Sequence, residues 1–184
     1  HQAPHQQQEL YAKLLGLAAH NVRVICDDVG GAFGIKLQFY GDEAAVAVAA
    51  KMLGRPVRFA ADRLESFAAD VHARDHEVNA RIGFDAEGHI LGLDLDDIFA
   101  IGPYSQYPRA SVMESSHILQ LTAAPYRLPA YRGRARVVYQ NKGLMGHYRA
   151  VGQPLACAIG EVMLDDAARR LGIDPVEIRR RNYV

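Results

Sequence analysis

The glycine-rich run at residues 30–36, Gly-Gly-Ala-Phe-Gly-Ile-Lys, is the first segment whose residue types could do chemistry. Glycines let a backbone turn sharply and approach a ligand closely, and consecutive N–H groups then bind oxyanions. The run matches neither the GxGxxG pattern of dinucleotide-binding proteins nor the Walker pattern of nucleotide triphosphatases, so those two classes are not indicated. Composition alone favours a tight turn without a ligand over a binding loop.

A second candidate is the irregular segment 143–154, which includes Tyr148, Arg149 and Ala150 and directly precedes a predicted helix. Free N–H groups at a helix N-terminus favour an anion, and Arg149 can donate charged hydrogen bonds to a phosphate or oxo group. The alternative is a helix-entry loop whose arginine is solvated. Taken alone, this segment does not decide between the two interpretations.

The remaining titratable clusters are weaker candidates. His72 and His76 have the spacing of a metal-binding pair on a helix, but they border a segment with strand periodicity, so no metal site is predicted there. Glu161, Asp165 and Asp166 are interpreted as a solvated helix face. The sequence therefore predicts no direct protein ligand to a metal.

Composition excludes several classes of protein. Lys and Arg together number 21, as do Asp and Glu, and this balance argues against a dedicated nucleic-acid binder. Cys26 and Cys157 are too few and too far apart for an iron–sulfur cluster, a Cys-rich zinc site or a disulfide framework. A reducing compartment follows, so the cytoplasm is expected, with the periplasm as the alternative. No signal peptide or membrane-spanning run is visible, and a start at His1 suggests an excised piece or a processed product.

Periodicity and capping residues predict the elements. Helices are expected at 7–17, 42–53, 111–121 and 155–171, with one more after the N-cap Asp174. A capping box formed by Asp62 and Glu65 opens a short helical turn. Strands are expected at 22–26, 57–60, 78–84, 91–95 and 132–136. The last strand carries arginines 132, 134 and 136 on one face, which is expected to be solvent-exposed.

These elements predict the α+β class, with mixed sheet segments and packed helices, because they alternate too irregularly for a doubly wound sheet. The chain is interpreted as one partial domain, 1–184, with two lobes at roughly 1–70 and 71–184 as an option.

Five segments together resemble a known family. They are residues 1–5, 24–36, 125–129, 148–154 and 171–182, in that order. Their succession resembles the first cofactor-binding domain of the large subunits of molybdenum hydroxylases, the family of xanthine dehydrogenase and aldehyde oxidoreductase. Each motif is moderately specific, but all five in order cover essentially the whole chain.

The resemblance implies a molybdopterin cofactor with molybdenum, in its cytosine dinucleotide form. Gln2 matches the glutamine that hydrogen-bonds an oxygen ligand on molybdenum. The first loop matches the segment whose backbone holds the metal–pterin end, and the second matches the loop beneath the metal. The implied cofactor-binding residues are Gln2, Gly30, Gly31, Ala32, Phe33, Gly34, Tyr148, Arg149 and Ala150.

Departures from the family bear on the substrate. Leu37 and Ser115 stand where purine-oxidising members have a glutamate and an arginine, so xanthine is not the expected substrate. Ala150 stands where carbon monoxide dehydrogenases carry a copper-binding cysteine, which argues against CO oxidation. Val151 replaces an aromatic residue that packs on flat substrates. Leu37, Ser115 and Val151 are therefore the predicted residues of the substrate pocket.

The resemblance implies an oxidoreductase that uses water to hydroxylate an aldehyde or an N-heteroaromatic carbon. Electrons then leave through iron–sulfur clusters and FAD on other domains or subunits. The general-base glutamate is expected in a domain beyond this chain, so no catalytic residue is assigned here and the isolated chain is expected to be inactive. The implied partners are the rest of the large subunit, the electron-transfer subunits and a small-molecule substrate, without nucleic acid.

Two alternatives remain open. One is a non-catalytic binding or assembly module in which the glycine-rich run is only a turn. The other is a hydrolase that uses the histidine pair, which is disfavoured because GxSxG, HExxH and a recognisable nucleophilic cysteine are all missing.

Overall fold

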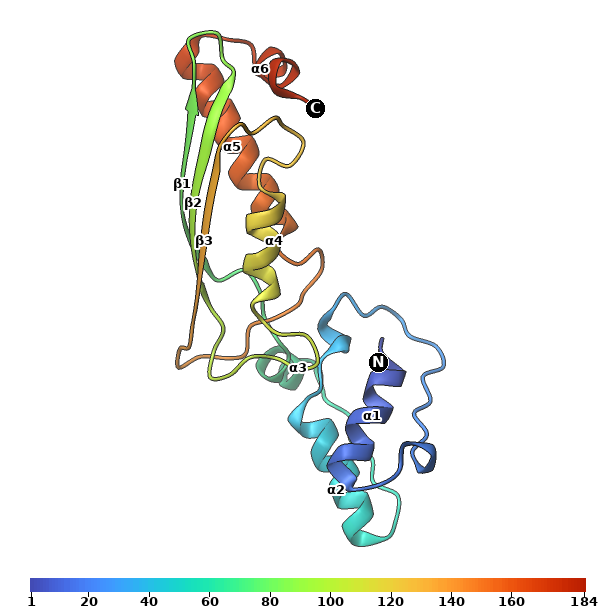
Figure 1. The fold of residues 1–184 in the computed structure, drawn as a ribbon. Coiled ribbons are helices and arrows are strands. Elements are labelled where there is room, and N and C mark those ends of the chain that lie inside the picture. Colours follow the sequence, from blue (N-terminus) through green and yellow to red (C-terminus); the bar gives the residue numbers. More distant parts are fainter.

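The computed structural model describes residues 1–184 and contains two regions that lie end to end (Figure 1). In the N-terminal region, helices α1 (Pro4–Leu15) and α2 (Gly41–Leu53) lie side by side, and the short helix α3 (Arg63–Ala69) follows. Short 3-10 turns lie at Ala19–Asn21 and Ile35–Leu37. None of the helices in the chain combines the length and apolar composition needed to span a membrane.

The C-terminal region is a three-stranded sheet covered on one face by helices (Figure 1). Strands β1 (His76–Phe84) and β2 (Ile90–Ala100) form an antiparallel hairpin, and β3 (Tyr131–Val138) pairs in parallel with β2. Helices α4 (Met113–Leu121) and α5 (Gln153–Leu171) pack on the sheet, and α6 (Pro175–Asn182) lies at its far end. The sheet is mixed, and the predicted α+β class is confirmed.

The core lies between the sheet and the helices. Leu93, Leu95 and Phe99 alternate along β2 and are buried, as are Ile118 of α4 and Leu164 of α5. Burial of each such side chain stabilises the fold by about 1.5–3 kcal/mol. The apolar face of the hairpin therefore packs against the apolar faces of the helices in one core.

Three predicted helix boundaries are confirmed, whereas the first helix, expected at 7–17, runs from Pro4 to Leu15. The Asp62 side chain accepts from the Glu65 N–H and the Glu65 side chain accepts from the Asp62 N–H, which completes the capping box. Gly172 ends α5 in the left-handed conformation with φ of 67°. Asp174 caps α6 by accepting from two backbone N–H groups, ahead of the proline at the first helical position.

Two predicted strands are wrong. Residues 22–26 and 57–60 form no strand in the structure. All three strands of the sheet come after residue 75. An alternating pattern reports which side chains are apolar, but a strand also needs a neighbouring strand for its N–H and C=O groups. This chain provides no such neighbour for either segment.

Candidate functional site

The two candidate loops, distant in sequence, contact each other directly. The Arg149 N–H donates to the Phe33 carbonyl at 2.7 Å, and the Arg149 guanidinium lies 5.3 Å from the centre of the Phe33 ring. Gly34 lies against the backbone of the second loop, because a Cβ there would come within 3.0 Å of the His147 carbonyl oxygen. The second loop thus holds the glycine-rich loop at its midpoint.

Both loops adopt backbone conformations that L-residues rarely take. The φ angles are 53° at Phe33, 92° at Gly34 and 69° at Ala150. Left-handed conformations at non-glycine residues cost about 1–3 kcal/mol and cluster at ligand-binding sites, where the surrounding structure imposes them. The shape of these loops therefore points to a binding role.

The N–H groups of the two loops fit an oxygen-rich ligand. Those of Gly31, Ala32 and Phe33 have no acceptor within the chain, and the same holds for Ala150 and Val151. The residues that carry these donors are half-buried or exposed, so without a ligand the N–H groups face water. The row is available to oxygen acceptors of a bound group.

Gln2 joins the first loop. Its side-chain oxygen accepts from the Gly34 N–H at 3.0 Å, and its own N–H donates to the Lys36 carbonyl at 2.9 Å. The amide NH2 of Gln2 has no partner within the chain, so it remains free to donate to a ligand. The structure therefore joins Gln2 to the glycine-rich loop, which the second loop contacts in turn.

Tyr40 fixes the end of the glycine-rich loop. Its hydroxyl donates to the Ile35 carbonyl at 2.9 Å. Burial raises the pKa of this hydroxyl, with a smaller increase from the nearby Asp70 carboxylate. The hydroxyl therefore stays protonated and keeps donating at any physiological pH.

The predicted pocket residues lie in less accessible places. Leu37 is buried directly after the loop, and its N–H donates to the Gly34 carbonyl at 3.2 Å. Ser115 on α4 is fully buried, and its hydroxyl has no hydrogen-bond partner. The Val151 carbonyl accepts from the His117 ring at 2.9 Å, which ties the second loop to α4. No hydrogen bond connects Ser115 to either loop, so its role in a pocket stays a prediction.

His147 supports the second loop without adding charge. Burial lowers the pKa of its ring, and the nearby Arg109 lowers it further, so the ring is neutral near pH 7. It lies 3.2 Å from the side-chain nitrogen of Gln38, which donates to Nδ1 of the neutral ring. The Gln38 side chain is itself completely buried.

His76, Asp97 and Glu114 form a buried cluster that the sequence did not predict. His76 does not pair with His72: its Nδ1 lies 2.8 Å from an Asp97 carboxylate oxygen, and its Nε2 lies 3.6 Å from a Glu114 oxygen. No group of three or more His, Cys, Asp or Glu side chains is arranged to hold a metal ion. The signal for this cluster was Asp97, a charged residue at an inward position of β2 that otherwise carries apolar side chains.

The acidic face of α5 is solvent-exposed, as predicted: the side chains of Glu161, Asp165 and Asp166 are 36%, 53% and 42% exposed. Glu161 and Asp165 both bind Arg179 of α6, at 2.8 and 2.7 Å, so they connect two helices. Only Asp166 pairs within its own helix, with Arg169 and Arg170. These contacts between helices form because α6 folds back onto α5, which a local sequence pattern does not predict.

The arginine-bearing face of β3 also carries ion pairs. Arg132 binds Asp94 at 2.6 Å and Arg136 binds Asp96 at 3.0 Å. Exposed pairs of this kind contribute at most about 1 kcal/mol each. The face is solvent-exposed, as expected, and its charges are balanced by the neighbouring strand.

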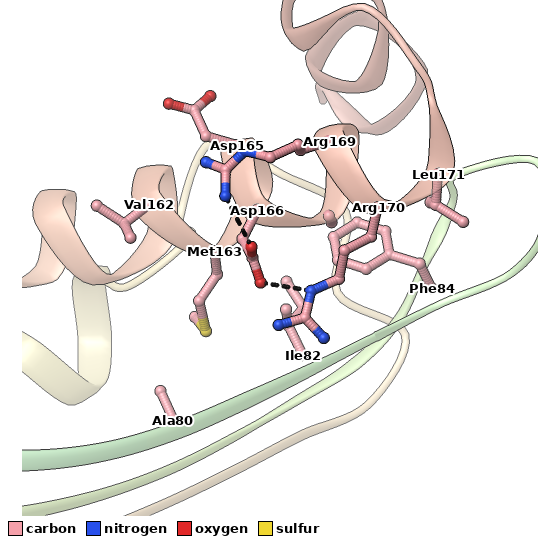
Figure 2. Close-up of a pocket in the computed structure, with 11 residues that line it drawn as sticks. Ala80, Ile82, Phe84, Val162, Met163, Asp165, Asp166, Arg169, Arg170 and Leu171 are labelled. Carbon is pink, nitrogen blue, oxygen red and sulfur yellow. Dashed lines mark hydrogen bonds and ion pairs between the residues drawn. The ribbon is translucent and has the colours of Figure 1, made fainter.

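Two cavities of the domain are large enough to hold a ligand. One of about 470 Å³ adjoins the glycine-rich loop and extends between α2 and α3. Another, of about 620 Å³, lies between β1 and α5 and is shown in Figure 2. The second contains no residue of either loop, and its Asp166 is already bound to two arginines (Figure 2). The loops are therefore the better candidate.

This chain is similar in sequence and fold to known proteins. The model of the molybdopterin cofactor-binding domain matches residues 1–183. The chain is 35% identical, over 98% of its length, to the 6-hydroxypseudooxynicotine dehydrogenase complex subunit gamma of Paenarthrobacter nicotinovorans, and covers 22% of that protein. It is 33% identical, over its whole length, to the nicotine 6-hydroxylase large subunit of the same organism, again covering 22%.

Among solved structures, quinoline 2-oxidoreductase from Pseudomonas putida 86 superimposes with a TM-score of 0.94 at 35% identity. That match covers 98% of this chain and 23% of the other. The chain thus spans less than a quarter of the length of these relatives. With two backbone loops and Gln2 assembled as described, this chain belongs to the molybdopterin cofactor-binding domain family of molybdenum hydroxylase large subunits.

Proposed function

We propose that this chain forms one wall of the molybdenum cofactor site in a larger hydroxylase that oxidises an N-heteroaromatic ring carbon. The observation that carries the proposal is the row of unpaired N–H groups on two loops joined by the hydrogen bond from Arg149 to Phe33. In this reaction a ring C–H and water give a C–OH, two electrons and two protons.

The residues present fit a molybdopterin group. The N–H groups of residues 31–33 supply donors to oxygen atoms of the group, and the Gln2 amide supplies another beside them. Arg149 adds a cation next to the same loop, where it stacks on Phe33. When bound, the cofactor supplies transfer of oxygen from water to carbon and uptake of two electrons.

The chain's own residues would bind and orient rather than transfer protons. Gln2 and the two loops would fix one end of the cofactor. The neutral His147, hydrogen-bonded to Gln38, would support the second loop. The proton acceptor of the reaction is proposed to come from another part of the larger subunit, with iron–sulfur clusters and FAD beyond it. The cytosine dinucleotide form of the cofactor is likewise part of the proposal.

The substrate class is argued from charge and from the relatives. Leu37, Ser115 and Val151 carry no charge, so an N-heteroaromatic ring with fewer polar substituents than xanthine suits them better. The names of three relatives refer to nicotine, hydroxypseudooxynicotine and quinoline. These names favour an N-heteroaromatic compound over an aldehyde.

The test uses the native complex that contains this chain, purified from its source. Molybdenum, pterin and released nucleotide are measured first. Quinoline, nicotine, benzaldehyde and xanthine are then compared with a dye as electron acceptor, in water labelled with oxygen-18. We expect molybdenum with a cytidine nucleotide, and label in the hydroxylated heteroaromatic products.

Different outcomes contradict different parts of the proposal. A complex without molybdenum or pterin would leave a binding or assembly module as the better account. A molybdenum-containing complex that oxidises benzaldehyde but neither heteroaromatic compound would overturn the substrate class alone.

A further inference from the structure

Arg74 connects the second loop to the body of the domain, although it lies 74 residues before it. Its guanidinium donates to the Tyr148 carbonyl at 3.2 Å and also to the Arg149 carbonyl. The same guanidinium lies 5.3 Å from the centre of the Tyr148 ring. One planar cation therefore contacts two consecutive carbonyl groups and the side-chain ring of Tyr148.

The backbone of Arg74 is held in an unusual conformation. Its φ angle is 69°, in the left-handed region that a residue with a Cβ avoids. The Arg74 N–H donates to a carboxylate oxygen of Glu114 at 3.3 Å. Since Glu114 is completely buried on α4, this contact fixes the backbone at Arg74, two residues before β1 begins.

Glu114 is in turn held by a buried ion cluster. The side chains of His76, Asp97 and Glu114 are fully buried, with His76 between the two carboxylates. The imidazole ring stacks on Phe99 with a centroid distance of 4.1 Å. Breaking the bond between His76 and Asp97 would leave both buried groups without a partner, so the cluster resists rearrangement.

The protonation of His76 agrees with this arrangement. Burial lowers the pKa of its ring, but the hydrogen bond with Asp97 and the charges of Asp97 and Glu114 outweigh burial, and the pKa is raised overall. The ring is hydrogen-bonded through Nδ1 to Asp97, while Nε2 lies 3.6 Å from Glu114, a distance that allows charge attraction but no hydrogen bond.

We propose that Arg74 is a positioning residue for the cofactor site: His76, Asp97 and Glu114 fix its backbone, and its guanidinium holds the second loop against the glycine-rich loop. The hydrogen bond from the Arg149 N–H to the Phe33 carbonyl is the contact that this clamp protects. Only the consequence for cofactor retention rests on the proposed function.

The experiment measures hydrogen exchange by mass spectrometry in the native complex that contains the chain. Arg74→Gly removes the guanidinium while tolerating the left-handed backbone. Arg74→Lys keeps the charge and most of the side chain, but it loses the planar guanidinium that lies over the Tyr148 ring. The matched control is Arg132→Ala, which removes an arginine whose side chain is 79% exposed and which binds Asp94.

We expect the Arg149 amide, which donates to the Phe33 carbonyl, to exchange about tenfold faster in Arg74→Gly, because local opening of the loop costs less free energy. Arg74→Lys should fall between this variant and the unmodified protein, and Arg132→Ala should leave this amide unchanged. Guanidinium ion at concentrations far below those that unfold proteins should restore protection in Arg74→Gly. Glu114→Gln should also speed exchange, but guanidinium should not rescue it.

The readouts separate positioning from general stability. Faster exchange in the β1–β2 hairpin as well as at the Arg149 amide, without guanidinium rescue, would mean a merely structural role and overturn the proposal. Unchanged exchange at the Arg149 amide in both Arg74 variants would overturn it too.

Cofactor content distinguishes this inference from the function on which it builds. We expect Arg74→Gly to retain less molybdenum and pterin than Arg132→Ala. If the unmodified complex contains neither, the proposed function fails while the exchange result still decides the role of Arg74. If the unmodified complex holds the cofactor and Arg74→Gly retains it fully with normal loop exchange, only the positioning role fails.

Discussion

Gly34 is a residue at which the two candidate loops pack backbone against backbone. Its φ of 92° and the 3.0 Å distance from a built Cβ to the His147 carbonyl oxygen leave no room for a side chain. Gly30, four residues earlier in the same loop, has open space where a Cβ would lie. The two glycines thus have different roles despite their shared motif.

Gly34→Ala is expected to destabilise the domain by about 1–3 kcal/mol, because both the φ angle and the steric contact oppose a Cβ. Gly30→Ala, the matched control, should change stability by less than about 0.5 kcal/mol, the usual effect of an unconstrained surface change. Scanning calorimetry of the native complex compares the two Tm values. Equal Tm values would contradict the claim that Gly34 sets the distance between the loops.

At the scale of elements, Asn182 fastens α6 to the hairpin that leads into β2. Its side-chain oxygen accepts from the Ile90 N–H at 2.7 Å, and its side-chain nitrogen donates to the Gly88 carbonyl at 2.7 Å. The side chain is 3% exposed. One amide therefore satisfies two backbone groups at the turn between two strands.

Asn182→Ala is expected to cost about 2–4 kcal/mol, since buried backbone groups lose their partners and the net bonds are lost as well. Thermal unfolding of the complex measures the loss. Asn141→Ala, at an exposed residue without side-chain hydrogen bonds, provides the control and should be close to neutral. A small effect at Asn182 would mean that water replaces its contacts and that α6 is only loosely attached.

At the scale of the whole molecule, the two regions differ in how much they bury. Only Gln7, Ala12, Leu37 and Gln38 are buried among residues 1–70. Large apolar side chains of this region are exposed, including Met52 at 81% and Phe67 at 67%. Since the chain spans less than a quarter of its relatives, we propose that further parts of the larger subunit cover this surface.

Residues 1–184 expressed alone should therefore show weak protection of the amides in α1 and α2 and strong protection in the β1–β2 hairpin. The physical reason is that local stability follows apolar burial and shielded hydrogen bonds. Hydrogen exchange on the isolated chain makes the measurement, with the native complex as reference. Equal protection of both regions in the isolated chain would contradict the dependence on other parts.

Much of the fold was predictable because its signals are local. The capping residues Asp62 and Asp174 and the terminal glycine Gly172 predicted helix ends that the structure confirms. The alternating apolar residues predicted the hairpin. The strands at 22–26 and 57–60 were wrong because the presence of a partner strand is not a local property.

For the site, the sequence by itself determined which segments matter. The order of five motifs implied Gln2 and the two loops, and these do lie together. Their individual roles toward the cofactor, and the pocket roles of Leu37, Ser115 and Val151, stay predictions.

Only the tertiary structure decided how those segments are held. The contact of Arg74 with Tyr148, the burial of His76 between Asp97 and Glu114, and the attachment of α6 to α5 join residues far apart in the chain. Such contacts depend on packing that brings distant backbone together. Residue types and local spacing therefore did not predict these contacts.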